Sequence, residues 1–115
     1  MADYQVTIHL TDNTDPNGPG NFNYAPGYLQ VHQGDRVRFK CNRPFTVKFL
    51  YGSPFVTTGN NPVPVSGFFK NVASTTDYMV IDPNVELQPY HYIVSATDAD
   101  GKITVDGGCP SIDVL

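Results

Sequence analysis

The chain has 115 residues, a length typical of one domain, and it can bury about 65% of its unfolded surface and fold without a metal. Its hydrophobic fraction of 40% excludes a disordered polar chain, and no apolar run approaches the roughly 18 residues that a membrane-spanning helix needs. The formal net charge of −4 argues against general affinity for nucleic acid or for anionic membranes.

Apolar residues alternate with polar ones in the first half of the chain, which predicts short β-strands. Four strands are expected there: residues 4–10, 28–32, 36–41 and 45–51. The stretch 11–25 is rich in Asp, Asn, Pro and Gly and predicts a loop. The alternation is clearest over residues 36–41, where one set of side chains faces inward (Val37, Phe39, Cys41) and the other faces solvent (Arg36, Arg38, Lys40).

The second half of the chain begins with an irregular stretch. Residues 52–70 contain three prolines and predict a long surface excursion with a short strand near residues 63–65. Further strands are expected over residues 78–81, 89–97, 102–105 and 111–115. Residues 82–84 and 98–101 predict tight turns. Seven or eight strands at this spacing predict an all-β fold, a two-sheet Greek-key sandwich that forms one domain over residues 1–115.

Two segments resemble the cupredoxin family. Residues 29–42 (LQVHQGDRVRFKCN) are similar to its strand, Gly-Asp turn and alternating strand that ends in Asn. Residues 90–105 are similar to its aromatic strand, which enters a loop and returns through a Gly-Lys-Ile-Thr-Val segment. The resemblance implies a cupredoxin-like sandwich, although an immunoglobulin-like sandwich would satisfy the strand pattern nearly as well.

The family resemblance also implies a type-1 copper site, with a His after the Asn and a Cys, a His and a Met near the C-terminus. The matching positions hold other residues. Phe45 and its neighbours follow Asn42 without a His, Val94 stands where the Cys is expected, and Asp98 begins the loop that would carry the remaining ligands. We therefore expect a domain that lacks the copper site and has no cofactor.

Other metal sites and catalytic groups receive weak support from the sequence. Asn13, Asp15 and Asn17 resemble the opening half of a calcium loop, but Tyr24 occupies the twelfth position, where a bidentate Glu is needed. The alternative is a turn stabilised by its own Asx side chains. His9, His32 and His91 have no metal-ligand spacing, and no serine lies in a nucleophile motif. We expect no enzymatic activity.

Aromatic and basic residues form the candidate ligand or partner surfaces. The aromatic candidates lie in or beside two predicted loop regions, residues 11–28 and 51–70: Phe22, Tyr24, Tyr51, Phe55 and Phe68, with Tyr28 nearby. The basic candidates share one strand face: Arg36, Arg38 and Lys40. The alternatives are rings that cap the hydrophobic core and a basic face that is simply solvated or that protects a sheet edge.

The sequence therefore predicts a non-catalytic binding module for a protein, small-molecule or glycan ligand, with no affinity for nucleic acid or membrane. The alternative is an assembly protein that associates with itself through sheet edges. A metal-dependent enzyme is the least supported of the three hypotheses. Three interpretations stay open for Cys41 and Cys109: buried hydrophobic residues, a disulfide, or a reactive thiol. The N-terminal residues MADYQVTIHL contain no signal peptide, which predicts a cytoplasmic protein, or a secreted or periplasmic one if a leader was removed.

Overall fold

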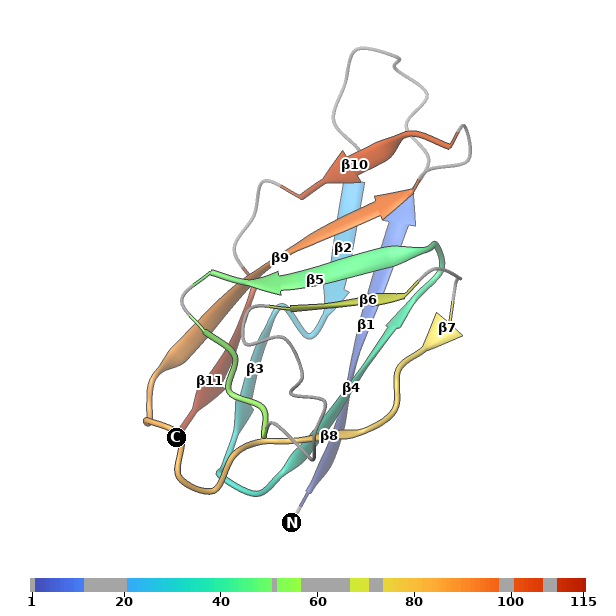
Figure 1. The fold of residues 1–115 in the computed structure, drawn as a ribbon. Coiled ribbons are helices and arrows are strands. Elements are labelled where there is room, and N and C mark those ends of the chain that lie inside the picture. The colour runs from blue at the N-terminus through green and yellow to red at the C-terminus, as the bar shows by residue number, and fades with distance from the viewer. Residues whose placement is uncertain are drawn as a thin grey trace.

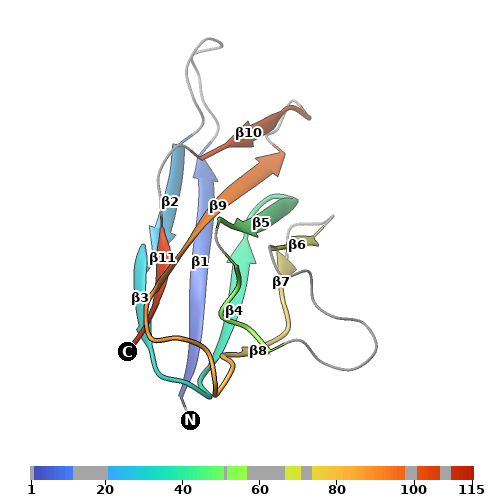
Figure 2. The same cartoon turned by 60° about the vertical axis from the view of Figure 1, so that its left-hand side comes forward.

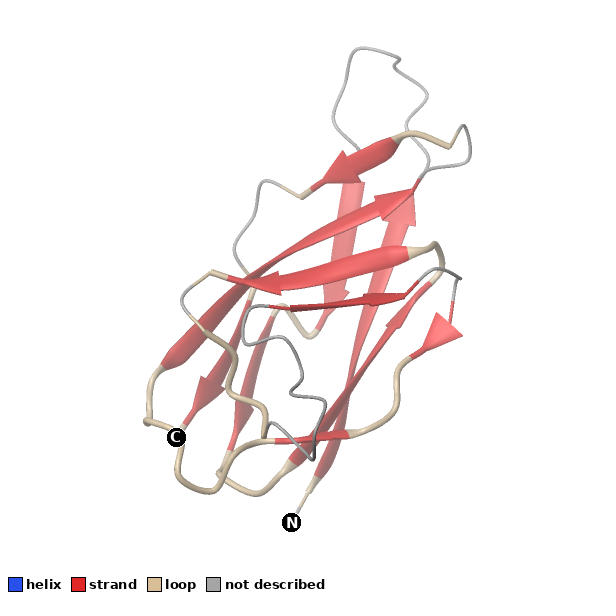
Figure 3. Ribbon diagram, viewed as in Figure 1, coloured by secondary structure: helices blue, strands red, loops and turns tan. Residues whose placement is uncertain are grey.

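The computed structural model describes residues 2–11, 21–50, 52–56, 67–70, 74–97, 101–106 and 110–115. These residues form strands and loops, and none of them is helical (Figure 3). No described segment is thus a helix long and apolar enough to cross a membrane. The strands build two sheets that pack face to face, so the predicted all-β sandwich is confirmed (Figures 1 and 2).

The first sheet has the order β2-β1-β4-β7, where β7 pairs with the end of β4 and β8 pairs with its beginning. Its strands are β1 (Asp3–Thr11), β2 (Asn21–Ala25), β4 (Arg36–Cys41), β7 (Ser74–Thr75) and β8 (Met79–Val80). β1 runs antiparallel to β2 and parallel to β4, with Val6 opposite Phe39. This register places the apolar residues of both strands on the face that meets the second sheet.

The second sheet has the order β3-β11-β9-β5-β6, and β10 pairs with the C-terminal part of β9. Its strands are β3 (Tyr28–Val31), β5 (Phe45–Phe49), β6 (Gly67–Lys70), β9 (Pro89–Thr97), β10 (Ile103–Val105) and β11 (Ser111–Val114). β11 is parallel to β3 and antiparallel to β9. Each sheet therefore contains one parallel pair, which differs from the two antiparallel sheets of the immunoglobulin alternative.

The core lies between the sheets and is built mainly from the inward-facing residues of β1, β3, β4, β5, β9 and β11. Its centre is aromatic. The Tyr92 ring lies 5.6 Å from Phe39 and 5.4 Å from Phe49 between centroids. Phe55 meets Phe39 and Phe49 edge to face, at 6.4 and 5.8 Å. Edge-to-face pairs of this kind add to the free energy gained by burying the rings.

Asp35 holds the turn between β3 and β4. Gly34 adopts a φ of +85°, which suits glycine, and Asp35 is 5% exposed. Its two carboxylate oxygens accept hydrogen bonds from the backbone amides of Ala2 and His32, both at 2.9 Å. The carboxylate thus joins the start of the chain to the beginning of β4.

Two predictions of local structure were wrong. The predicted loop over residues 11–25 ends in β2, because Phe22 and Tyr24 alternate with polar residues opposite β1. The predicted excursion over residues 52–70 contains β6, whose backbone pairs with β5. The short strand expected near residues 63–65 lies outside the described residues.

Candidate functional site

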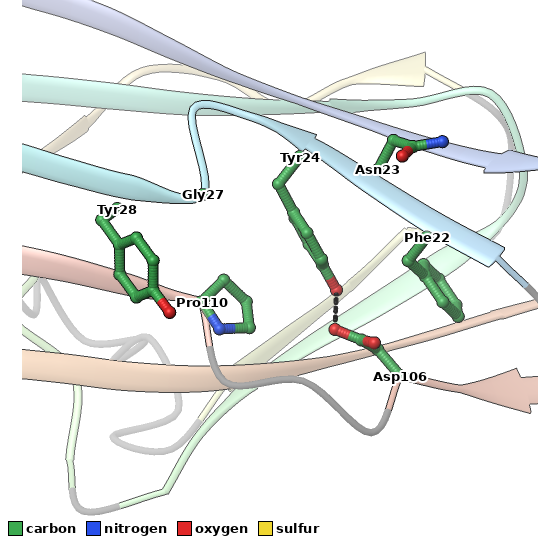
Figure 4. A pocket seen from close by; sticks show the side chains of 7 residues that line it. All are labelled: Phe22, Asn23, Tyr24, Gly27, Tyr28, Asp106 and Pro110. Carbon is green, nitrogen blue, oxygen red and sulfur yellow. Dashed lines mark hydrogen bonds between the residues drawn. The ribbon is translucent and has the colours of Figure 1, made fainter.

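A hollow of about 330 Å³ opens on the side of the sandwich where β2 faces the second sheet (Figure 4). Its lining comes from β2, the β2–β3 link, β3, the segment after β10 and the segment before β11: Phe22, Asn23, Tyr24, Gly27, Tyr28, Asp106 and Pro110. Residues more than 80 positions apart in the sequence thus meet at one place. The volume lies at the small end of the range for ligand pockets, so it suits a small ligand or one end of a larger one.

The register of β2 directs its two rings into this hollow. Tyr24 pairs with Ile8 and Phe22 with Leu10, and both partners are buried in the core. Side chains that pair across strands share a face, so both rings lie on the inner face of the first sheet. They are nearly parallel, at 14°, with centroids 6.4 Å apart. The Asn23 side chain points to the other side of β2 (Figure 4).

A hydrogen bond between the two sheets forms the back of the hollow. The Tyr24 hydroxyl donates to the Asp106 carboxylate at 2.5 Å (Figure 4). Burial, and then this hydrogen bond, raise the pKa of Tyr24 far above its ordinary value. The phenol is therefore neutral at physiological pH and remains a donor. A carboxylate can accept several hydrogen bonds, so the acidic group can still accept from a ligand.

Tyr28 and Pro110 form the opposite side of the hollow. The Tyr28 side chain is 70% exposed and lies at the first residue of β3, beside Pro110 (Figure 4). The Ser111 amide donates to the Gly27 carbonyl at 3.1 Å and fixes the approach of these two segments. The site therefore combines three aromatic rings, one proline and one carboxylate.

Tyr92 lies behind Tyr24 and contacts it edge to face, with centroids 6.3 Å apart. The Tyr92 side chain is fully buried, and its hydroxyl has no hydrogen-bond partner among the residues that the structure describes. Burial, with a smaller contribution from the Asp106 charge, raises the pKa of Tyr92. This unpaired hydroxyl is a cost to the fold that the aromatic packing around it must offset.

The structure brings together only part of the predicted aromatic set. Phe22 and Tyr24 line the hollow with Tyr28. The prediction that Phe55 lies on a ligand surface was wrong, because its ring is 6% exposed and packs between Phe39 and Phe49. Tyr51 and the side chain of Phe68 lie outside the described part of the structure. Sequence reasoning missed Asp106 and Pro110, because only the pairing of distant strands carries them to β2.

The basic candidates lie elsewhere. Arg36, Arg38 and Lys40 alternate with buried residues of β4, so they occupy the outer face of the first sheet, opposite to the face that carries Phe22 and Tyr24. The hollow and the basic face are thus two separate surfaces.

The described metal-binding side chains do not gather. His9 is on β1, His32 follows β3 and His91 is on β9. Within the described ranges, no three His, Cys, Asp or Glu side chains are grouped so that they could hold a metal ion. Phe45 and Val94, at two of the positions that the family resemblance assigns to copper ligands, are buried in the core. Asp98 and the calcium candidates Asn13, Asp15 and Asn17 lie outside the described residues.

Cys41 is a free thiol that is 2% exposed at the end of β4. This agrees with its interpretation as a buried hydrophobic residue, and burial raises the pKa of the thiol. The alternative disulfide with Cys109 is not formed by Cys41 in this structure, and Cys109 itself lies outside the described residues.

Comparisons with known proteins assign no family to the chain. No family model matches the chain. No curated protein matches it either. Among solved structures, a pseudoazurin from Sinorhizobium meliloti is similar at 17% identity and a TM-score of 0.48, over 100% of this chain and 75% of that chain. A likeness at this level says nothing about a copper site or an activity in this chain.

Proposed function

We propose that the protein is a non-catalytic binding module whose site is the hollow between β2 and β3, and that its ligand is a neutral sugar. The observation that carries the proposal is that Phe22, Tyr24 and Tyr28 line one hollow together with the Asp106 carboxylate, which Tyr24 contacts. A pyranose has an apolar face of C–H groups and a rim of hydroxyls. Aromatic rings offer large apolar surfaces to the first, and a carboxylate accepts hydrogen bonds from the second.

A binding role fits these residues better than catalysis. The only described titratable groups in the hollow are one carboxylate and two phenols, and Tyr24 holds its proton. A carboxylate can act as a base or nucleophile, but among the described lining residues Asp106 has no second group that could exchange a proton near neutral pH. A type-1 copper site would need a thiolate and imidazoles, whereas the matching positions carry the apolar side chains of Phe45 and Val94. We therefore propose a module without copper or catalytic function.

The proposal is tested by titrating the ¹⁵N-labelled protein with neutral hexasaccharides of glucose, xylose, mannose and N-acetylglucosamine. We expect one of these probes to shift the amide signals of residues 22–28 and 106. Tyr28→Ala should weaken that binding about fivefold, because one stacked ring contributes about 1 kcal/mol. Tyr28 is largely exposed, so its replacement leaves the fold intact. Leu87→Ala, another exposed apolar residue, is the control and should bind normally.

Tetramethylammonium is the probe for a competing ligand class, because rings beside a carboxylate can also hold a cation. Asp106→Asn keeps an acceptor oxygen but removes the charge. For a sugar ligand we expect only a few-fold loss in this variant. If none of the four sugars binds, or if tetramethylammonium binds and Asp106→Asn abolishes that binding, the sugar assignment is wrong.

A further inference from the structure

The outer face of the first sheet carries a basic row, which we define as Arg36, Arg38 and Lys40 on β4. Alternate residues of a strand repeat about every 6.7 Å, so the three Cα positions span about 13 Å in a straight line. The protein as a whole has a net charge of −4. The basic row is therefore a local positive patch on an acidic molecule.

Among the described residues, a neighbouring carboxylate neutralises the positive charge of the basic row only at its Arg36 end. Arg36 forms a two-point ion pair with Asp3 on β1, with N–O distances of 2.7 and 2.5 Å. Arg38 donates from Nε to the neutral Gln5 side chain at 2.8 Å. Lys40 is exposed and pairs in register with Thr7 and Thr75. Within the described structure, neither Arg38 nor Lys40 forms an ion pair, so two cations have no carboxylate bound to them.

Tyr78 orders the two guanidinium groups. The Cζ atoms of Arg36 and Arg38 lie 4.8 and 4.7 Å from the centre of the Tyr78 ring. Such contacts hold long side chains in place and lower the entropy lost when a ligand binds. They also occupy the one described aromatic ring beside the basic row. A nucleic-acid platform would need that ring free to stack on a base.

We propose that the basic row is a docking surface for an extended acidic peptide whose Asp or Glu residues stand at alternate positions. The side chains on one side of an extended peptide repeat at the same interval of about 6.7 Å as the cations of β4. Two successive carboxylates of such a peptide can therefore meet Arg38 and Lys40 together. The surface faces away from the hollow, so the test of this proposal does not depend on whether the hollow binds a sugar.

The experiment compares two fluorescein-labelled octapeptides of the same composition. One alternates Glu and Thr, and the other, the block peptide, repeats Glu-Glu-Thr-Thr, so that no two of its Glu residues stand at alternate positions. Fluorescence anisotropy is measured at about 20 mM and about 150 mM salt, because screening weakens exposed ion pairs. We expect the alternating peptide to bind several-fold more tightly than the block peptide. The double variant Arg38→Glu with Lys40→Glu should weaken its binding about tenfold or more.

Lys48→Glu is the matched control, because Lys48 is an exposed cation on β5 of the other sheet. It reverses one charge away from the basic row, against two in the double variant, and should alter the affinity by less than about twofold. If circular dichroism shows that the double variant is unfolded, the exposed Lys40→Gln takes its place and should weaken binding a few-fold. Absence of binding, equal affinity for both peptides, or an unchanged affinity in the charge-altered variant would overturn the proposal. Tighter binding of an eight-nucleotide oligothymidylate would assign the surface to nucleic acid and overturn it too.

Discussion

Asp35 shows how one buried carboxylate can hold a fold together. Burial opposes its charge, yet the hydrogen bonds from the Ala2 and His32 amides outweigh that effect and lower the pKa of Asp35 below its ordinary value. Asp35→Asn keeps a single acceptor oxygen, so one of the two amides loses its partner. We expect a loss of about 1–2 kcal/mol in the free energy of unfolding at neutral pH, measured by urea denaturation.

The effect of Asp35 should depend on pH. A carboxylate whose pKa is lowered by folding stabilises the protein above the unfolded pKa of about 4, and that contribution is lost as the pH falls through the folded value. The difference between wild type and Asp35→Asn should therefore shrink below about pH 4. A difference that stays constant from pH 7 to about pH 2.5 would show that the charge of Asp35 is not involved.

The contribution of Tyr24 to stability should have the opposite pH dependence and be lost at alkaline pH. Folding raises its pKa, so its contribution is complete below the unfolded value of about 10 and is lost as the pH rises above it. Tyr24→Phe removes the hydrogen bond to Asp106 and should cost about 1 kcal/mol at pH 8. Denaturation at about pH 11 should show a smaller gap, because only the wild type loses this contribution. Parallel stability curves for the two proteins would contradict the prediction.

At the level of elements, β1 and β4 are joined by more than their backbone ladder. Beyond its last pair, Ile8 with Cys41, the Asn42 side chain accepts from the Leu10 amide at 2.8 Å and donates to the Leu10 carbonyl at 3.0 Å. The amide side chain thus substitutes for one further residue of a strand. This explains in physical terms why the alternating strand of this chain ends in Asn.

Asn42 can therefore be tested by two variants with different chemistry. Asn42→Ala leaves both polar groups of Leu10 without this partner and should cost about 1–2 kcal/mol of unfolding free energy. Asn42→Asp can still accept but, when ionised, cannot donate to the Leu10 carbonyl. We expect it to be as harmful as Asn42→Ala at pH 7 and to recover partly when it is protonated below about pH 4. Thermal unfolding of both variants at the two pH values would show this, and equal pH responses would contradict it.

Most strands that alternation predicted have one face in the core, but β10 is exposed at Ile103 and Val105. β4 and β9 have the predicted bounds, and β1, β3, β5, β10 and β11 lie within two residues of theirs. β2 was missed because Asn and Pro around its two rings are typical of loops. β8 lies within the strand predicted over residues 78–81, whereas the two-residue strand β7 was not predicted and is defined by its pairing with β4. Local sequence carries no signal for such pairings.

The same limit applies to the candidate site. The aromatic content of residues 22–28 was visible in the sequence, so half of the hollow could be predicted. Asp106 could not, because it reaches Tyr24 only after β10 pairs with β9 and β2 pairs with β1. For Phe55 the sequence prediction was wrong in the opposite direction. A ring within a Pro-rich stretch is expected to be exposed, but the tertiary structure buries it.

At the scale of the whole molecule, the second sheet depends on its last strand. β11 lies between β3 and β9, so residues 28–31 are joined to β9 only through residues 111–114. Ile112 and Val114 are buried, and they pair with Leu29 and Val31, which are buried as well. A sandwich closed by pairings this distant in sequence should fold slowly, on the scale of milliseconds to seconds.

Ending the chain at Pro110 should therefore prevent folding, because it removes two buried apolar side chains, Ile112 and Val114, and leaves β3 without its described partner in the second sheet. We expect circular dichroism and urea titration of the shortened protein to show no cooperative transition. Removal of Leu115 alone is the control, since this residue is 54% exposed, and that protein should remain folded. Ile112→Ala should fall between the two, with a loss of about 2–5 kcal/mol from the cavity left in the core. A cooperative transition in the chain that ends at Pro110 would mean that β3 and β9 can close the sheet without β11.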